Sequence, residues 1–262
     1  IDTRDTFYDG EEKFWNTFGP ELEEYEQAWK AAMLDSPFRK DFSAEYGDLM
    51  FLNAEIARKC FKPEIIPEMQ QENDLTQEYE KLLASAQIPF EGKTYTLSQL
   101  TPLKSDPDDA RRLAAWQADA KWSMEHAAEL DELYDKLVHL RDSMGKKMGY
   151  EGYTTLGYYR MNRNCYTKED VEKFRTAVQK YLVPVADKIC RKQAERLGKT
   201  YPLSFADLAL EFRSGNPCPM GTPDDILAQG MKFYGELSPE TKVFFRTMLD
   251  NELLDVLSTE GK

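Results

Sequence analysis

The stretch LDELYDKLVHLRDSM, residues 130–144, decides the fold class, because its apolar residues recur at helical spacing. Intervals of three and four residues place them on one face of an α-helix: Leu130, Leu133, Leu137, Leu140 and Met144. No proline or glycine interrupts the chain from 108 to 144. We therefore predict one long central helix of about 40 residues that begins after Ser105-Asp106-Pro107.

Helix caps elsewhere predict that most of the remaining chain is also helical. Three pairs place a hydroxyl acceptor at the cap and proline at the first helical position: Ser36-Pro37, Thr222-Pro223 and Ser238-Pro239. The run from Thr167 to Asp170 resembles a capping box that opens another helix, and Pro184 should bend that helix. Further helices are expected over roughly 12–34, 63–86 and 203–213.

One segment has the pattern of strands. Residues alternate on either side of Glu91-Gly92, which predicts a two-stranded hairpin near 88–98. An isolated hairpin is only marginally stable, so this one should pack on helices. The predicted fold class is mainly α: a multi-helix lobe with one long central helix and a small β-hairpin.

The composition excludes several classes of partner. The chain of 262 residues has a net charge of −13, which disfavours nucleic acid and anionic membranes as partners and leaves neutral or basic peptides. No apolar run approaches 20 residues and no signal peptide is present. The four cysteines form no Cys-x-x-Cys, which indicates free thiols in a reducing compartment. We therefore expect a cytoplasmic protein.

A search for catalytic motifs finds none. The triplets Gly92-Lys93-Thr94 and Gly198-Lys199-Thr200 lack the glycine of a phosphate loop, since Gln87 and Gln193 stand in its place. The two histidines, His126 and His139, are too far apart in sequence to bind one zinc from a single helix face. His126 and Glu129 are expected to form an exposed pair one turn apart. We predict no catalytic, cofactor-binding or metal-binding residue in this chain.

Short motifs nevertheless follow one another in a distinctive order along the whole chain. In sequence they are Asp5-Thr6-Phe7-Tyr8-Asp9, Ser36-Pro37-Phe38-Arg39, Glu72-Asn73-Asp74-Leu75, Phe90-Glu91-Gly92-Lys93, Met148-Gly149-Tyr150, Gly157-Tyr158-Tyr159-Arg160-Met161-Asn162-Arg163 with Tyr166, and Gly215-Asn216-Pro217-Cys218-Pro219-Met220-Gly221. In this order they resemble the oligoendopeptidase F branch of the thimet oligopeptidase superfamily. Each motif alone is weak, and the order and spacing carry the resemblance.

The resemblance implies a two-lobed helical zinc metalloendopeptidase whose channel admits short oligopeptides. In the family a His-Glu-x-x-His helix and a downstream Glu bind zinc, and this sequence contains neither. The chain begins at Ile1 and stops soon after an apolar run at 253–257, as a cut chain would. We therefore expect the N-terminal, channel-wall portion, inactive without the missing C-terminal catalytic part. Zinc is implied for the full-length enzyme only, and none for this chain alone.

The expected domains are a helical subdomain over 1–104, with the hairpin, and a helical part of the peptidase domain over 105–262 that ends before the zinc-binding segment.

Tyr158, Tyr159 and Arg160 either line the channel or, as we favour, pack and pair between helices. Two other functions stay open: an acidic all-helical binding module, and an unrelated enzyme with a triad built across space. A cut lobe should also expose a large apolar face.

Overall fold

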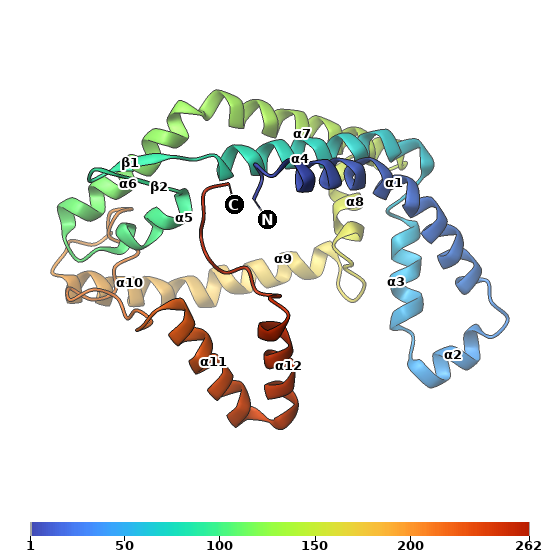
Figure 1. Cartoon of the computed structure of the whole chain (residues 1–262). Coiled ribbons are helices and arrows are strands. Elements are labelled where there is room, and N and C mark those ends of the chain that lie inside the picture. The colour runs from blue at the N-terminus through green and yellow to red at the C-terminus, as the bar shows by residue number, and fades with distance from the viewer. Residues whose placement is uncertain (1, 262) are drawn as a thin grey trace.

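The chain folds into an open arch of helices (Figure 1), in a computed structural model that describes residues 2–261. The α-helices are α1 (Thr6–Leu34), α2 (Arg39–Tyr46), α3 (Leu49–Arg58), α4 (Ile66–Ala84), α5 (Leu97–Leu100), α6 (Asp109–Glu125), α7 (Ala127–Lys147), α8 (Tyr153–Arg160), α9 (Lys168–Ala177), α10 (Val183–Leu197), α11 (Pro223–Leu237) and α12 (Pro239–Asp250). Short 3-10 turns, η1 (Pro63–Ile65) and η2 (Thr101–Ser105), precede α4 and α6. The mainly helical fold class is confirmed.

The arch is built around the packing of α4 on α7. Of the apolar face expected over 130–144, Leu133 and Met144 are buried, and Leu130, Leu137 and Leu140 pack against the core at its edge. α1 lies alongside α4, α3 packs on α1, and α8 packs on both α7 and α3. The two chain ends meet inside the arch, where Thr3 donates a backbone hydrogen bond of 2.6 Å to the Gly261 carbonyl.

The long central helix is present as two consecutive helices, α6 and α7, divided at His126. The backbone of His126 has φ −102° and ψ 8°, outside the α-helical range. The two halves have different partners, because α6 packs on the hairpin and on η2, whereas α7 packs on α4. The division therefore follows from tertiary packing rather than from a helix-breaking residue.

The helix that opens at Thr167 is confirmed, including its capping box with Asp170. A π-helical turn, η3 (Val178–Leu182), lies between α9 and α10 just before Pro184, and the bend expected at Pro184 stays a prediction. Val183 donates its backbone N–H to the carbonyl of Val178, five residues earlier. A wider turn is a common way to accommodate a proline that would clash with the carbonyl four residues before it.

One expected helix start and one expected helix are wrong. α2 begins at Arg39 rather than at Pro37, because the Ser36 hydroxyl accepts from Phe38 in a turn outside the helix. The segment 203–213 forms turns instead of a helix. Its carbonyl groups accept hydrogen bonds from side chains of other helices: Gln193 donates to Leu208 and Leu210. The caps at Thr222 and Ser238 are confirmed.

The hairpin is confirmed as β1 (Ile88–Phe90) and β2 (Lys93–Tyr95), antiparallel with Pro89 opposite Thr94. It packs on α6 through buried Ile88, and Arg111 forms an ion pair of 2.8 Å with Glu91 at its turn.

The domain boundary at residue 104 remains a prediction, and one core cluster joins residues from both sides of it. Over residues 2–261, no helix is both long and apolar enough to cross a membrane.

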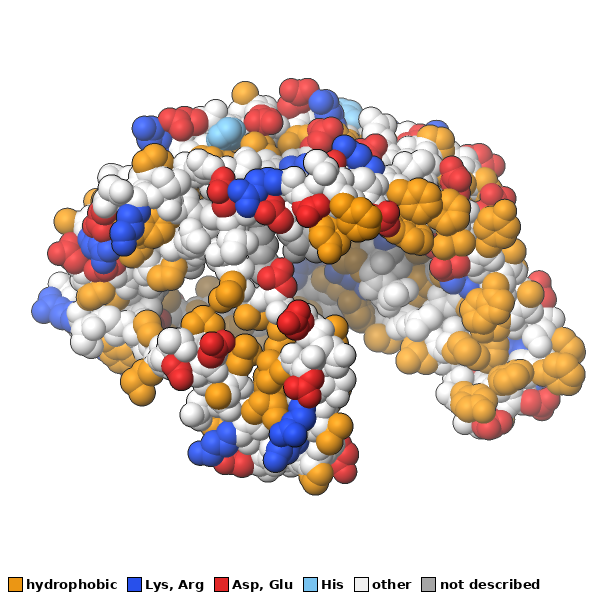
Figure 2. Space-filling view, in the orientation of Figure 1, with side chains coloured by type: hydrophobic (Ala, Val, Ile, Leu, Met, Phe, Trp, Pro, Cys, Tyr) orange, Lys and Arg blue, Asp and Glu red, His pale blue; other side chains and the backbone are white. Residues whose placement is uncertain are grey.

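The later helices leave large apolar faces in solvent. α9, α11 and α12 bury no residue, and a stripe of large side chains on α1 is also exposed (Figure 2): Phe7, Phe14, Phe18, Leu22, Tyr25 and Trp29. The solvent-accessible surface is 18092 Å². A compact monomer of 30.4 kDa exposes about 11,800 Å². The expected exposed apolar face is therefore confirmed.

Candidate functional site: a cavity between α3, α8 and α9

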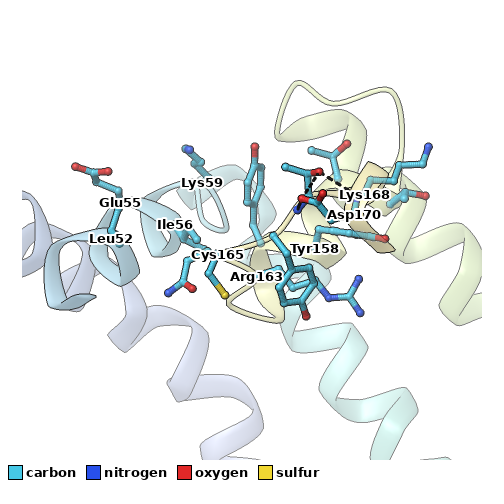
Figure 3. Close-up of a pocket in the computed structure, with 15 residues that line it drawn as sticks. Leu52, Glu55, Ile56, Lys59, Tyr158, Arg163, Cys165, Lys168 and Asp170 are labelled. Carbon is cyan, nitrogen blue, oxygen red and sulfur yellow. Dashed lines mark hydrogen bonds between the residues drawn. The ribbon is translucent and has the colours of Figure 1, made fainter. Parts of the chain in front are cut away.

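A cavity lies where α8 meets α3 and the start of α9 (Figure 3). Its volume is about 570 Å³. Figure 3 shows α3 with Leu52 and Glu55 on one side, Lys168 and Asp170 of α9 on the other, and Tyr158, Arg163 and Cys165 between them. The remaining lining residues are Ile56, Lys59, Thr154, Thr155, Tyr159, Asn164, Tyr166 and Thr167. A cavity of this size holds a few residues of a peptide or a small molecule.

The structure separates the three residues of α8 that the sequence singles out. Tyr158 and Tyr159 line the cavity. Arg160 points away from it and forms an ion pair of 2.7 Å with buried Glu72 on α4. The favoured interpretation, pairing with a neighbour, therefore holds for Arg160, and the two tyrosines instead border open space.

A charge network centred on the buried carboxylate of Glu72 holds α8 against the core. Glu72 also accepts from Arg141 of α7 at 2.7 Å, and Arg160 donates to the Tyr153 hydroxyl at 3.1 Å. Burial acts to raise the pKa of Glu72, but hydrogen bonds from Arg160 and Arg141 outweigh burial and hold this pKa below its usual value. Glu72 is therefore ionised at neutral pH and ties three helices together.

Cations stack on the aromatic rings of the cavity. The Arg163 guanidinium carbon lies 4.2 Å from the centre of the Tyr158 ring and 5.7 Å from that of Tyr166. The Lys59 ammonium lies 5.1 Å from the ring centre of Tyr159. These contacts are in the range of cation–π attraction, so they hold the rings and the charges in place together.

The carboxylates that border the cavity already have partners. Glu55 forms an ion pair of 2.7 Å with Arg39, and Asp170 accepts from the Thr167 backbone and from Lys173, both at 3.1 Å. The Thr167 backbone hydrogen bond, with help from Lys173, lowers the pKa of Asp170. Sequence reasoning did not find Lys59, Arg163 and Lys168 as site residues, and the one available signal was Arg163 between Tyr158-Tyr159 and Tyr166.

No nucleophile and base come together in residues 2–261. Burial raises the pKa of the Cys60 thiol to about 11, so this sulfur is protonated at neutral pH. His126 contacts Glu129 at 3.4 Å, as expected, and His139 contacts its own helix at Asp135. The predicted free thiols are confirmed: Cys60, Cys165, Cys190 and Cys218. The structure therefore offers no support for a Cys–His triad.

The described residues also do not form the metal site or the phosphate loops for which the sequence was searched. Within the described part of the chain, no group of three His, Cys, Asp or Glu side chains is placed to hold a metal ion. The first Gly-Lys-Thr triplet lies at the hairpin turn, and Gly198 of the second ends α10 in a left-handed conformation. Neither triplet forms a phosphate loop.

Comparisons with known proteins agree with the sequence motifs. Residues 1–61 match the family model of the Peptidase M3 N-terminal domain. No curated protein sequence matches significantly. The whole chain matches solved structures of a protein assigned as an oligoendopeptidase F (39% identity, TM-score 0.96), of Pz peptidase A with an inhibitor (41%, 0.95), and of an assigned oligoendopeptidase F from Bacillus anthracis (40%, 0.96).

The matches cover all of this chain but less than half of each matched chain. All of this chain is covered, but it spans only 46% of the first two matched chains and 48% of the third. The identity near 40% holds over the full chain, so the shared fold reflects common descent rather than a general helical likeness. The chain is therefore homologous to the M3 oligopeptidases, and it corresponds to the N-terminal portion of the relatives that it matches.

Proposed function

We propose that this chain is the channel-wall portion of a cytoplasmic, zinc-dependent metalloendopeptidase that hydrolyses short oligopeptides. Hydrolysis would require the catalytic portion, and the chain alone would be inactive. The observation that carries the proposal is the full-length match at about 40% identity to proteins twice as long, two of them assigned as oligoendopeptidases. The free cysteines are consistent with a reducing compartment.

The exposed surface supports the same proposal. The excess of some 6,000 Å² over a compact monomer is larger than most interfaces between separate proteins. It includes continuous apolar stripes on long helices, which seldom stay in water unless another surface covers them. A covering portion of similar size, as the relatives have, would account for the excess.

Zinc would be held by that other portion. The described residues do not provide a zinc site, because zinc sites take at least three nitrogen, sulfur or oxygen side-chain ligands converging on one point. In the proposed enzyme this chain would bind and orient the peptide and limit access to unfolded chains. The rival function, a stand-alone binding module, would leave the apolar faces for a partner of another kind.

Fragment complementation tests the proposal. The C-terminal portion of the matched Bacillus anthracis oligoendopeptidase F, expressed separately, is mixed with this chain, and cleavage of a quenched fluorescent nonapeptide is followed. We expect no cleavage by either fragment alone and chelator-sensitive cleavage by the mixture, with no attack on a folded protein. Activity in the chain alone, or none in a mixture that has formed a complex, would overturn the proposal.

Dye binding provides a second prediction. The chain alone should bind an apolar fluorescent dye several-fold more strongly than a globular protein of equal mass, because its stripes on α1 and α9 to α12 are exposed. Addition of the C-terminal portion should reduce that fluorescence in proportion to complex formation. Fluorescence at the level of the globular control would show that the apolar stripes are covered in solution, contrary to the proposal.

A further inference from the structure

The cavity between α3, α8 and α9 has an excess of unpaired positive charge. Of the five charged residues that line it, the carboxylates of Glu55 and Asp170 are neutralised by partners outside the cavity. Among residues 2–261, no carboxylate lies in ion-pair distance of the three cations Lys59, Arg163 and Lys168. The chain as a whole carries −13, so this cationic cavity is a local exception. A fixed positive site in an acidic molecule favours an anionic group of a ligand.

The cavity also offers surfaces for an apolar side chain and a peptide backbone. Tyr158, Tyr159 and Tyr166 line it, and within the described chain none of their hydroxyl groups has a hydrogen-bond partner. The Arg163 guanidinium carbon lies over the Tyr158 ring, and among residues 2–261 the guanidinium N–H groups donate no hydrogen bond, so their edge stays available. Such an edge binds a carboxylate through two parallel hydrogen bonds.

The start of α9 adds to the positive potential. Thr167 and Lys168, which line the cavity, are the N-cap and first residue of this helix. The capping box uses the Asp170 N–H, whereas the N–H groups of the first turn before it lie at the positive end of the helix dipole. This feature strengthens the anion preference that the side chains establish.

The walls are held in place before any ligand arrives. The Asn164 amide donates to Asn53 at 2.5 Å, which ties the 161–167 segment to α3. The Tyr150 hydroxyl donates to the Lys59 carbonyl at 2.9 Å and fixes the end of α3. Preorganised walls reduce the entropy lost on binding.

We propose that this cavity binds the carboxylate-bearing end of a short peptide, with Arg163 on the carboxylate and the tyrosines around the adjacent side chain. That this peptide is a substrate of the enzyme rests on the function proposed above. The carboxylate could be the peptide's C-terminus or an acidic side chain, and the cavity volume of about 570 Å³ suits the last two or three residues of a chain. We assign the C-terminus.

Calorimetric titration of the chain at low salt tests this assignment. The probes are an acetylated tripeptide ending in phenylalanine with a free carboxylate, its C-terminal amide, and an amide with an internal glutamate. We expect the free acid to bind about tenfold or more tightly than either amide, and Arg163→Gln to remove that difference. Arg163→Lys should restore it in part, because charge returns without the two-pronged geometry.

Arg175→Gln is the matched control. Arg175 lies on α9 outside the cavity, pairs with Glu172, and is 62% exposed, so its replacement should leave the affinity unchanged. Equal affinity for acid and plain amide, no binding of any probe, or equal losses in Arg163→Gln and Arg175→Gln would overturn the proposal. Preference for the internal glutamate would overturn the assignment to the C-terminus.

The complemented enzyme separates this inference from the proposed function. If the cavity is a substrate subsite, Arg163→Gln should raise KM about tenfold for free-acid peptides and leave kcat and the KM of amides unchanged. Cleavage with the same KM for acids and amides would defeat the cavity proposal and leave the peptidase proposal standing. If the chain binds free acids tightly but gives no active enzyme with the C-terminal portion, the peptidase proposal fails and the cavity proposal stands.

Discussion

The Gly145→Ala variant is expected to lose about 3 kcal/mol or more of unfolding free energy, although it adds a single methyl group. Gly145 lies inside α7, where the backbone of Gly152 and Tyr153 at the start of α8 touches it. An added Cβ would lie 2.4 Å from the carbonyl carbon and oxygen of Gly152 and 2.8 Å from the Tyr153 nitrogen. Backbone atoms cannot move aside as a flexible side chain can, so α8 must shift.

Chemical unfolding followed by circular dichroism measures this loss, with Gly10→Ala as the control. Gly10 is also inside a helix, α1, but an added Cβ there meets nothing within 4 Å. Alanine is the better helix former, so the control should gain about 0.5–1 kcal/mol. A small gain in both variants would mean that α7 and α8 are not in contact at Gly145.

Replacement of Glu72 by glutamine is expected to cost about 2–3 kcal/mol. Glu72 is only 5% exposed and accepts from both Arg141 and Arg160. Removal of the carboxylate leaves two guanidinium groups facing each other without a counter-charge, and such losses commonly reach 3–5 kcal/mol in full burial. The side chains of Arg141 and Arg160 are 39% and 32% exposed, so solvent screening reduces the figure.

Glu80→Gln is the control for that substitution, because Glu80 is an exposed residue of the same helix, and a change within about 0.5 kcal/mol is expected. Unfolding free energies of the native chain, Glu72→Gln and Glu80→Gln are compared at neutral pH. Equal stability of the two variants would show that the Glu72 network contributes nothing.

The stabilisation by Glu72 should also depend on pH. The two arginines lower the pKa of Glu72 in the folded chain, so the folded form holds its proton more weakly than the unfolded form. The contribution is complete above the unfolded pKa, near 4.5, and is lost as the pH falls through the folded pKa. The stability difference between the native chain and Glu72→Gln should therefore be constant from pH 7 to about 5 and shrink in more acidic solution.

Local signals in the sequence predicted most of the secondary structure. The apolar stripe over 130–144, the caps at Thr167, Thr222 and Ser238, and the Glu91-Gly92 turn all appear as expected. Each depends on contacts between residues a few positions apart, which a single sequence displays directly. The order of short motifs along the chain also indicated the family before any fold was known.

Long-range contacts decided the rest. Glycine is a poor helix former, yet Gly145 lies inside α7, where the backbone at the start of α8 leaves no space for a Cβ. The segment 203–213 reads as a helix, yet Gln193 takes the carbonyl groups that a helix would use. The division at His126 likewise follows from the different partners of α6 and α7.

The candidate site shows the same limit. Lys59 at the end of α3 and Arg163 beyond α8 are some hundred residues apart, and the one local signal was the place of Arg163 between Tyr158-Tyr159 and Tyr166. Their approach depends on α3 and α8 packing together, which no local pattern encodes. The sequence by itself therefore determined the helices, the hairpin and the family, because these follow from near neighbours and motif order. The tertiary structure alone decided the cavity and its charge, because these arise where distant segments meet.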